Sequence, residues 1–349
     1  MKSASALTSE IDDHLSGLHE EVKSVFHRHL VQPNRTNDLQ LSHFTKQESL
    51  IKILHSYEKH RPPDWLLKKH YLSLWLSDVS CLNDPLEGKA LFDFVEYWSR
   101  VGGFKQFGSK SFSSSEWEDL RHIAGWLRGD AARVMSSSRD PVVRRILICS
   151  FTQDTDRIDL WRAYGADGSG ICLSMPAAEA ISRLQAYKDR VSALYHVRYS
   201  AEDKATTWTM LNNHLKPLLE LSQQIVLEDD KESLRTKVVA ECEQVFHLYK
   251  HQQYRNEHEM RLLRTFDLTE PSCFANPRDG FGPGLRVDLE LNRVYAYSNP
   301  FFFGDTDSQI ILGPKVHDAS RLATTLSTFL EQLWPSHAPG VGLSTAPYR

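Results

Sequence analysis

Two glutamates stand two residues apart in the segment YRNEHEMRLLR, residues 254–264. Glu257 and Glu259 would share one side of a β-strand, because strand side chains alternate between the two faces with a period of two. Two carboxylates on one face can serve a single pocket and stabilise positive charge there. An exposed strand also often carries Glu-x-Glu beside arginine as cross-strand ion pairs. The pair alone therefore leaves an active site and a solvated strand face both open.

Three further polar clusters lie on predicted strands or in the turns that follow them. They are His43 to Thr45 in SHFT, Asn83 to Glu87 in NDPLE, and Trp161 to Tyr164 in WRAY. Each has an ordinary structural explanation, since Asn-Asp-Pro is a turn sequence and aromatic residues three apart on a helix usually belong to a core. Their joint occurrence, rather than any one of them, favours a functional site.

The elements that position these clusters follow from apolar periodicity. Residues 11–30 carry apolar side chains near a 3.6-residue period, which predicts an N-terminal amphipathic helix. The continuous apolar run RRILICSFT at 144–152 predicts a strand that is buried on both faces and central in a sheet. Further strands are predicted at 39–45, 71–78, 171–175, 193–200, 258–266, 284–298 and 309–314, and a terminal helix at 318–334.

These elements predict an α+β fold with mixed, largely antiparallel sheets and an N-terminal helix. The expected organisation is a helix and link at 1–36, then a single domain at 37–335, then a flexible tail at 336–349. Helical insertions within the domain are expected at about 90–140 and 204–253.

Composition limits the class of protein. The 349 residues carry a net charge of −4, without the basic excess of proteins that bind nucleic acid regardless of sequence. Five cysteines, an odd number without a C-x-x-C pair, favour a reducing cytoplasm. No apolar run approaches the roughly 18–20 residues of a membrane helix, so no membrane partner is expected.

Several familiar signatures fail on their spacing. GADGSG precedes a predicted strand instead of joining a strand to a helix, so it does not match a dinucleotide-binding loop. HEMRL lacks the second histidine of a zinc protease. His247 and His251 are four apart on a predicted helix, but no third ligand stands at a telling distance, and no metal is expected.

Taken in order, the polar clusters resemble the bacterial family catalogued as domain of unknown function 2971. The segments that carry the resemblance are His43-Phe44-Thr45, Leu82 to Glu87, Cys149-Ser150-Phe151 followed by Leu160 to Tyr164, and Tyr254 to Arg261. The resemblance spans about residues 39–315. Ser169 and Tyr254 depart from the family pattern, which has histidine and tryptophan at about these places.

The same order of His-x-Thr, a mid-chain aromatic and a late Glu-x-Glu is similar to ADP-ribosyltransferases, which use NAD as a substrate. The resemblance implies that Glu259 is the catalytic carboxylate and that Glu257 positions or deprotonates the acceptor. Breaking the glycosidic bond builds positive charge on the ribose, which a nearby carboxylate stabilises. The implied acceptor is a nucleic acid or a protein, as for a toxin or a phage-defence effector.

The resemblance also implies roles for the NAD-binding residues. His43 and Thr45 would hold the ribose, and Trp161 or Tyr164 would stack on the nicotinamide. Asn83, Asp84 and Glu87 would line the rim or orient the early loop, and Arg162 and Arg261 would meet the pyrophosphate through bidentate pairing.

Two other classes of function stay open at this point. One is a related fold that binds a nucleotide or a nucleic acid as a sensor without turnover. The other is an interaction protein whose N-terminal helix docks a partner such as an antitoxin. The ordinary alternative for that helix is a strap on its own domain.

Overall fold

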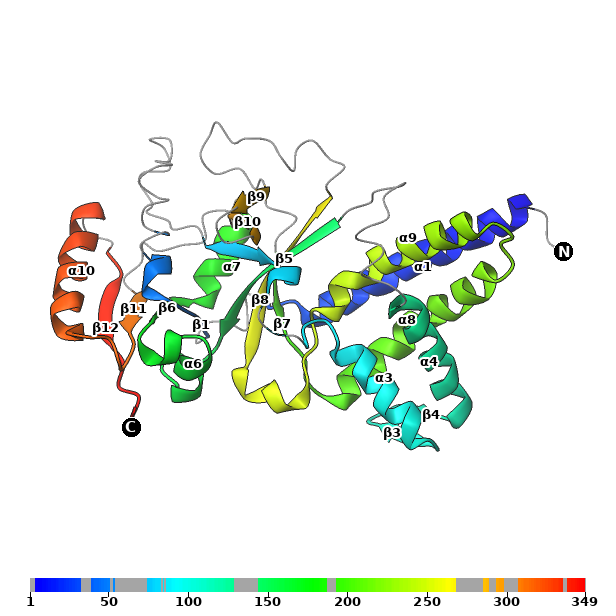
Figure 1. Ribbon diagram of the computed structural model, residues 1–349, viewed down its shortest axis with the longest axis horizontal. Helices are drawn as coiled ribbons and strands as arrows, with labels where there is room; N and C mark the ends of the chain where they lie inside the picture. Colours follow the sequence, from blue (N-terminus) through cyan, green and yellow to red (C-terminus); the bar gives the residue numbers. More distant parts are fainter. Residues whose placement is uncertain are drawn as a thin grey trace.

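The computed structural model arranges the chain around one large β-sheet, with long helices gathered beside it (Figure 1). It describes residues 4–32, 39–50, 53, 74–82, 84, 86–128, 144–186, 193–267, 285–288, 293–297, 307–334 and 338–348. The α-helices are α1 (Ala4–His29), α3 (Ala90–Val101), α4 (Ser114–Arg128), α6 (Ile158–Ala163), α7 (Ala177–Ala186), α8 (Ala201–Ser222), α9 (Glu228–Phe246) and α10 (Ala319–Leu333).

The strands within the described ranges form a ten-stranded sheet and a separate two-stranded ribbon. They are β1 (Gln40–Thr45), β2 (Trp75–Asp78), β3 (Lys105–Phe107), β4 (Lys110–Phe112), β5 (Arg144–Thr152), β6 (Ile171–Pro176), β7 (Ala193–His196), β8 (Glu259–Asp267), β9 (Leu285–Asp288), β10 (Arg293–Tyr297), β11 (Gln309–Leu312) and β12 (Gly340–Leu343). The main path through the large sheet is β12-β11-β6-β1-β5-β2-β10-β9, and β8 lies between β5 and β7. Neighbouring strands are antiparallel except β11 and β12. The predicted α+β class with a mixed, largely antiparallel sheet is confirmed.

The apolar part of strand β5, Ile146 to Cys149, is buried on both faces, as its continuous apolar sequence predicted, whereas Ser150 is exposed. Leu147, Cys149 and Phe151 enter a core shared with α7 and α10. Ile146 and Ile148 enter a second core shared with the long helices. Because alternate residues serve opposite faces, a stretch of strand that is covered on both sides needs apolar side chains at successive positions.

The two edges of β5 are used differently. β8 pairs with β5 along its full length and occupies one edge. On the other edge β1 joins opposite Thr152, whereas β2 joins opposite Ile148 and Leu147. Within the described pairings, residues 149–151 therefore face neither strand on that edge. We call this division of the sheet the fork.

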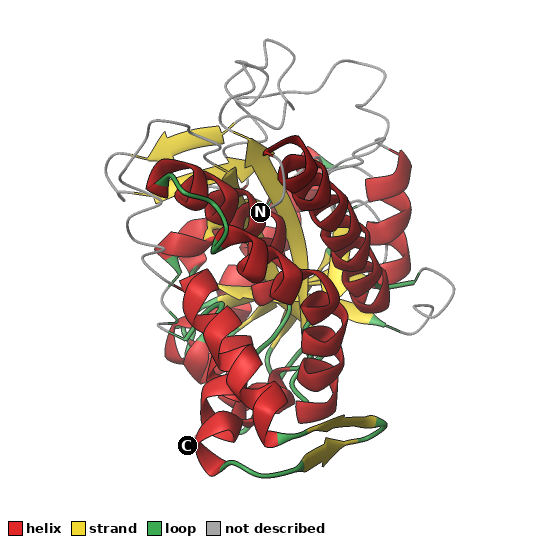
Figure 2. Cartoon of the chain, turned by 90° about the vertical axis from the view of Figure 1, so that its right-hand side faces the viewer, coloured by secondary structure: helices red, strands yellow, loops and turns green. Residues whose placement is uncertain are grey.

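Helices α1, α3, α4, α8 and α9 form a helical lobe that shares one core with a face of the sheet (Figures 1 and 2). α1 lies along α8 and α9, and its Leu18, Val22 and Val25 are buried among them. His29, at the end of α1, pairs through Nδ1 with the carbonyl of His196 at 2.8 Å and through Nε2 with the hydroxyl of Tyr249 at 2.8 Å. The apolar face of α1 is thus covered by its own chain, as a strap.

The C-terminal residues differ from the expected flexible tail. β12 pairs in parallel with β11, and Ser344 and Thr345 donate hydrogen bonds to Asp156 beside α6. The prediction of a flexible tail was wrong for residues 338–348, because the short segment GVGL has too few apolar residues to predict a strand. Among the helices of the described ranges, none has the length and apolar character needed to cross a membrane.

Candidate functional site

A cavity of about 280 Å³ opens at the fork. Residues 148–152 of β5 line it, and we call this segment the floor of the pocket. The other lining residues are Ser42, His43 and Phe44 of β1; Trp75 and Ser77 of β2; Leu82, Asp84 and Glu87 from the turn after β2; Leu160 and Tyr164 at α6; and Lys250, Glu257, Glu259 and Arg261. The fork thus gathers segments that are far apart in the sequence around one cavity.

Most of the sequence-predicted site residues meet in this pocket. Those that line it are His43, Asp84, Glu87, Tyr164, Glu257, Glu259 and Arg261. Asp84 accepts a hydrogen bond from the backbone N–H of Leu86 at 2.9 Å, which is the Asx turn expected of an Asn-Asp-Pro sequence. This turn brings Glu87 into the pocket. Asn83 lies outside the described residues.

Arg261 is the most highly bonded side chain of the site. Its Nε and Nη2 donate to the two oxygens of Glu259 at 2.7 and 3.2 Å, and Nη1 and Nη2 donate to the two oxygens of Glu87 at 2.6 and 2.9 Å. Nη1 also donates to the backbone carbonyl of His247. A guanidinium has five N–H donors, and all are engaged. Arg261 is therefore unavailable to a pyrophosphate, and the structure makes it the anchor of two carboxylates.

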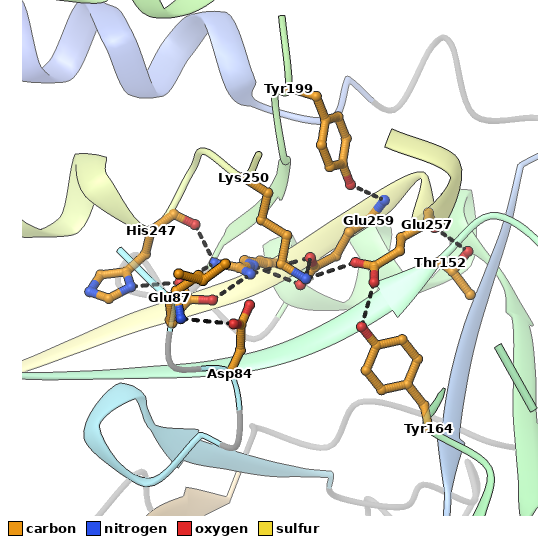
Figure 3. Close-up of polar contacts among 11 residues, drawn as sticks. Asp84, Glu87, Thr152, Tyr164, Tyr199, His247, Lys250, Glu257 and Glu259 are labelled. Carbon is orange, nitrogen blue, oxygen red and sulfur yellow. Dashed lines mark hydrogen bonds and ion pairs between the residues drawn. The ribbon is translucent and has the colours of Figure 1, made fainter. Parts of the chain in front are cut away.

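Glu257 and Glu259 converge on Lys250 (Figure 3). The Lys250 Nζ lies 2.7 Å from Oε2 of Glu257 and 2.7 Å from Oε2 of Glu259. Strand alternation is not the cause, because Glu257 ends the 3-10 helix η4 (Gln252–Glu257) and only Glu259 belongs to β8. His258 between them is left-handed, with φ 44° and ψ 45°. The turn at His258, not a two-residue strand period, brings the two carboxylates to one ammonium group.

The carboxylates of this cluster are held in their ionised form. Burial alone would raise the pKa of Glu87, but hydrogen bonds from His247 and Arg261 lower it to about 2. Burial likewise opposes ionisation of Glu259, and the charges of Arg261 and Lys250 outweigh it and lower the pKa of that carboxyl. The pKa of Lys250 is raised, because attraction to Glu259 and Glu257 exceeds the cost of its burial. At neutral pH Glu87, Glu259, Lys250 and Arg261 are therefore charged.

His43 is a neutral member of the pocket wall. Its Nδ1 lies 2.9 Å from the backbone carbonyl of Ser150 in the floor, and since a carbonyl can only accept, Nδ1 carries the proton. Burial lowers the pKa of His43, and the bond to Ser150 only partly opposes this. Nε2 is therefore an unprotonated nitrogen that can accept a hydrogen bond. Cys149, whose Sγ is 3.7 Å from Nδ1, is a protonated thiol because burial raises its pKa to about 12.

Tyr164 is an aromatic side chain of the pocket lining that solvent reaches. It follows α6 as the C-cap residue and is 45% exposed. Its hydroxyl donates a short hydrogen bond to Oε1 of Glu257 (Figure 3). Desolvation of the hydroxyl, together with the neighbouring Glu257, raises the pKa of Tyr164, so it remains a donor.

Trp161 lies in a core rather than on the pocket surface. It is fully buried, with its ring centroid 4.8 Å from that of Phe44 in an edge-on arrangement. Its indole N–H donates to Asp156 at 2.7 Å. Of the two aromatic residues proposed to stack on a ligand, only Tyr164 lines the cavity.

Thr45 and Arg162 also lie outside the cavity lining. Thr45 pairs with Ile171 across β1 and β6, one residue beyond the part of β1 that lines the pocket. Arg162 is exposed, and its guanidinium lies 5.1 Å from the ring centroid of Tyr348. The ribose and pyrophosphate contacts expected of these two residues are not part of this cavity.

Lys250 and Tyr199 are site residues that the sequence motifs missed. Tyr199 accepts a hydrogen bond from the backbone N–H of Glu259 at 3.0 Å and so fixes the start of β8. His247 was considered only as one of a metal-binding pair, yet its Nδ1 lies 2.8 Å from Glu87. In the ranges that the structure describes, no group of three or more His, Cys, Asp or Glu side chains is arranged as a metal site. In the sequence, the sign of this role is that Lys250 stands seven residues before Glu257.

The fold and site define an α+β protein with a charged pocket at the fork of its sheet. Residues 160–262 match the family described as Protein of unknown function (DUF2971). The matched segment contains Tyr164, Lys250, Glu257, Glu259 and Arg261, and over these residues it supports the resemblance to that family of unknown function. No curated protein and no solved structure matches the chain.

Proposed function

We propose that this protein is an NAD-dependent ADP-ribosyltransferase that transfers ADP-ribose to a nucleic acid or a protein. The observation that carries the proposal is the pair Glu257 and Glu259, which line one pocket together and share the ammonium group of Lys250. His43 and Tyr164, from two other sequence motifs, line the same pocket. Each of the three motifs thus contributes at least one residue to the lining of the pocket, which supports the proposal.

The charge of the pocket supports this substrate. Its described lining contains four carboxylates, on Asp84, Glu87, Glu257 and Glu259, against two cations, on Lys250 and Arg261. His43 adds no charge, since its pKa is lowered. A pocket with an excess of negative charge favours the cationic nicotinamide ring and disfavours a pyrophosphate. NAD would therefore enter with its nicotinamide riboside end.

The size of the pocket agrees with this orientation. A cavity of about 280 Å³ is at the small end of ligand sites. It suits the reacting end of a dinucleotide, with the pyrophosphate and adenosine outside. On this view the exposed Arg162, two residues before Tyr164 in the sequence, is a contact for phosphate at the rim.

The proposed reaction assigns one step to each carboxylate. The bond between ribose C1′ and the nicotinamide nitrogen breaks, and its electron pair moves to the ring nitrogen, which releases neutral nicotinamide. The ribose is left with positive charge, which Glu259 stabilises. An oxygen or nitrogen of the acceptor bonds to C1′ and loses its proton to Glu257.

The relative exposure of the two carboxylates supports this division of labour. The Glu257 side chain is 16% exposed and that of Glu259 is 6% exposed. Glu257 is also bonded to the accessible Tyr164. The more exposed carboxylate is the one that an incoming acceptor can reach. His43 Nε2 can accept a hydrogen bond from a ribose hydroxyl.

The test measures nicotinamide release and label transfer separately. Purified protein is incubated with labelled NAD and a mixture of cellular RNA, DNA and protein. Glu259→Gln should lower both release and transfer by about 10²–10³-fold, the usual effect of removing one electrostatic stabiliser of a transition state. Glu257→Gln should lower transfer more than it lowers release to water, because only transfer needs its base.

The matched control is Glu228→Gln, since the Glu228 side chain is 82% exposed and lies far from the pocket along the chain. This variant should keep full activity. If the folded wild-type protein binds NAD but shows neither release nor transfer, the catalytic proposal fails and the chain is a nucleotide-binding module instead.

A further inference from the structure

Among the described residues that line the pocket, Lys250 is the cation that touches both Glu257 and Glu259. Its side chain is 10% exposed, and Nζ is 2.7 Å from an oxygen of each glutamate. The backbone is fixed as well, because the Lys250 N–H donates to the carbonyl of Arg198 at 3.1 Å. The ring of Tyr254 lies 5.3 Å from Nζ. Lys250 is therefore held in place independently of any ligand.

Two carboxylates that share one small site repel each other, and without a cation one of them takes up a proton. Such a pair titrates as a unit rather than as two independent groups. Here the proposed reaction needs both carboxylates ionised at once, one to stabilise the ribose and one to accept a proton. Arg261 bonds Glu259 but not Glu257. Lys250 is thus the cation that links the two.

We propose that Lys250 is a positioning residue that keeps Glu257 and Glu259 ionised together and at a fixed spacing, so that the two act as one catalytic unit. This inference rests on the proposed transferase function. Lys250 acts through the glutamates and takes no part in breaking or forming bonds.

The other groups around the ammonium group agree with this role. Tyr164 donates to Glu257, and Tyr199 accepts from the backbone of Glu259, so each orients one glutamate. The charge of Arg261 opposes the charged form of Lys250 but is outweighed by Glu259. Both tyrosines have raised pKa values and stay neutral across the pH range in question. Lys250 and Arg261 are therefore the cations that balance the pair.

The experiment compares Lys250→Met with Lys250→Arg, which restores the positive charge. The rate of nicotinamide release is measured as a function of pH, and the acid limb is the fall of this rate at low pH. In the Met variant the acid limb should lie at least about one pH unit higher than in the wild type, since the pair then takes up a proton more readily. Activity at neutral pH should also fall by at least about tenfold, mainly in kcat, because the spacing of the two glutamates is no longer fixed. The Arg variant should return the limb to within about half a unit of the wild type.

A second measurement does not depend on turnover. The carboxyl carbons of ¹³C-labelled glutamate are titrated by NMR, with Glu257→Gln and Glu259→Gln used to assign the two signals. In the wild type Glu259 should titrate below its ordinary pKa of 4.5. In the Met variant the pair should bind a proton at higher pH, whether or not the protein turns over NAD. This separates a failure of the Lys250 inference from a failure of the transferase proposal.

Two outcomes would overturn the inference. One is a Met variant that is folded and active with an unmoved acid limb. The other is a wild-type titration in which Glu259 takes up its proton above 4.5, which needs no variant and so holds even if Lys250→Met does not fold.

Discussion

Replacing Glu87 with glutamine removes one charge from the centre of the ion-pair cluster. The Glu87 side chain is 6% exposed and bonded to Arg261 and His247, so solvent screens it little. Its pKa is about 2, against an ordinary value of 4.5. At 1.36 kcal/mol per pKa unit, this difference corresponds to about 3 kcal/mol of folding stability. The range for breaking a buried ion pair, about 3–5 kcal/mol, gives the same magnitude.

The pH dependence has a definite sign. The folded pKa of Glu87 lies below the unfolded value, so its contribution is fully present above 4.5 and is lost as pH falls toward about 2. Urea unfolding at pH 7 should show Glu87→Gln about 3 kcal/mol less stable than the wild type. At about pH 3 the difference should be roughly half as large.

The exposed control Glu228→Gln should change the unfolding free energy by less than about 0.5 kcal/mol at either pH. A Glu87→Gln difference below about 1 kcal/mol at pH 7 would refute the reasoning. So would a difference that stays constant in acid, because it would show that the lost stability does not come from the ionised carboxylate.

Two further outcomes follow from hydrogen bonds at the edge of the site. Tyr164→Phe removes the donor to Glu257, so label transfer should fall about tenfold while the melting temperature stays unchanged; equal transfer by the two proteins would remove Tyr164 from the proposed site. Asp156→Asn weakens the bonds from Trp161, Ser344 and Thr345, at a cost of about 1–3 kcal/mol. Limited proteolysis should then cut residues 338–348 faster than in the wild type, and an unchanged cleavage rate would show that Asp156 does not hold this segment.

Apolar patterns in the sequence predicted the elements of the fold, but not their division at the fork. The run at 144–152 predicted β5 as a central strand because continuous burial leaves a continuous apolar signature. The attachment of β1 and β2 to one edge of β5 leaves no such signature. It depends on register, which is set by pairing across the sheet and not by the residues of any single strand.

The candidate site was predicted by residue type and not by role. The motifs placed Glu87, Glu257, Glu259 and Arg261 in one pocket, yet Arg261 binds carboxylates and not phosphate. A guanidinium pairs with either kind of oxyanion, and the sequence does not say which one the fold brings within reach. The sequence motifs do not include Lys250 for a related reason. Its distance from the glutamates depends on a left-handed turn at His258 that sequence periodicity does not encode.

The floor of the pocket has a consequence for how this site can diverge. In the described pairings, residues 149–151 lie between the points where β1 and β2 join β5, and the carbonyl of Ser150 accepts a hydrogen bond from His43. Peptide groups are the same whatever side chains they carry. Related proteins that keep the fork can therefore differ in the other side chains that line the cavity, and so in the molecule that they bind. The backbone of the floor would stay the same. We expect the sequences of related proteins to vary most in the turn after β2 and around α6. The arrangement of β1, β2 and β5 at the fork should be conserved.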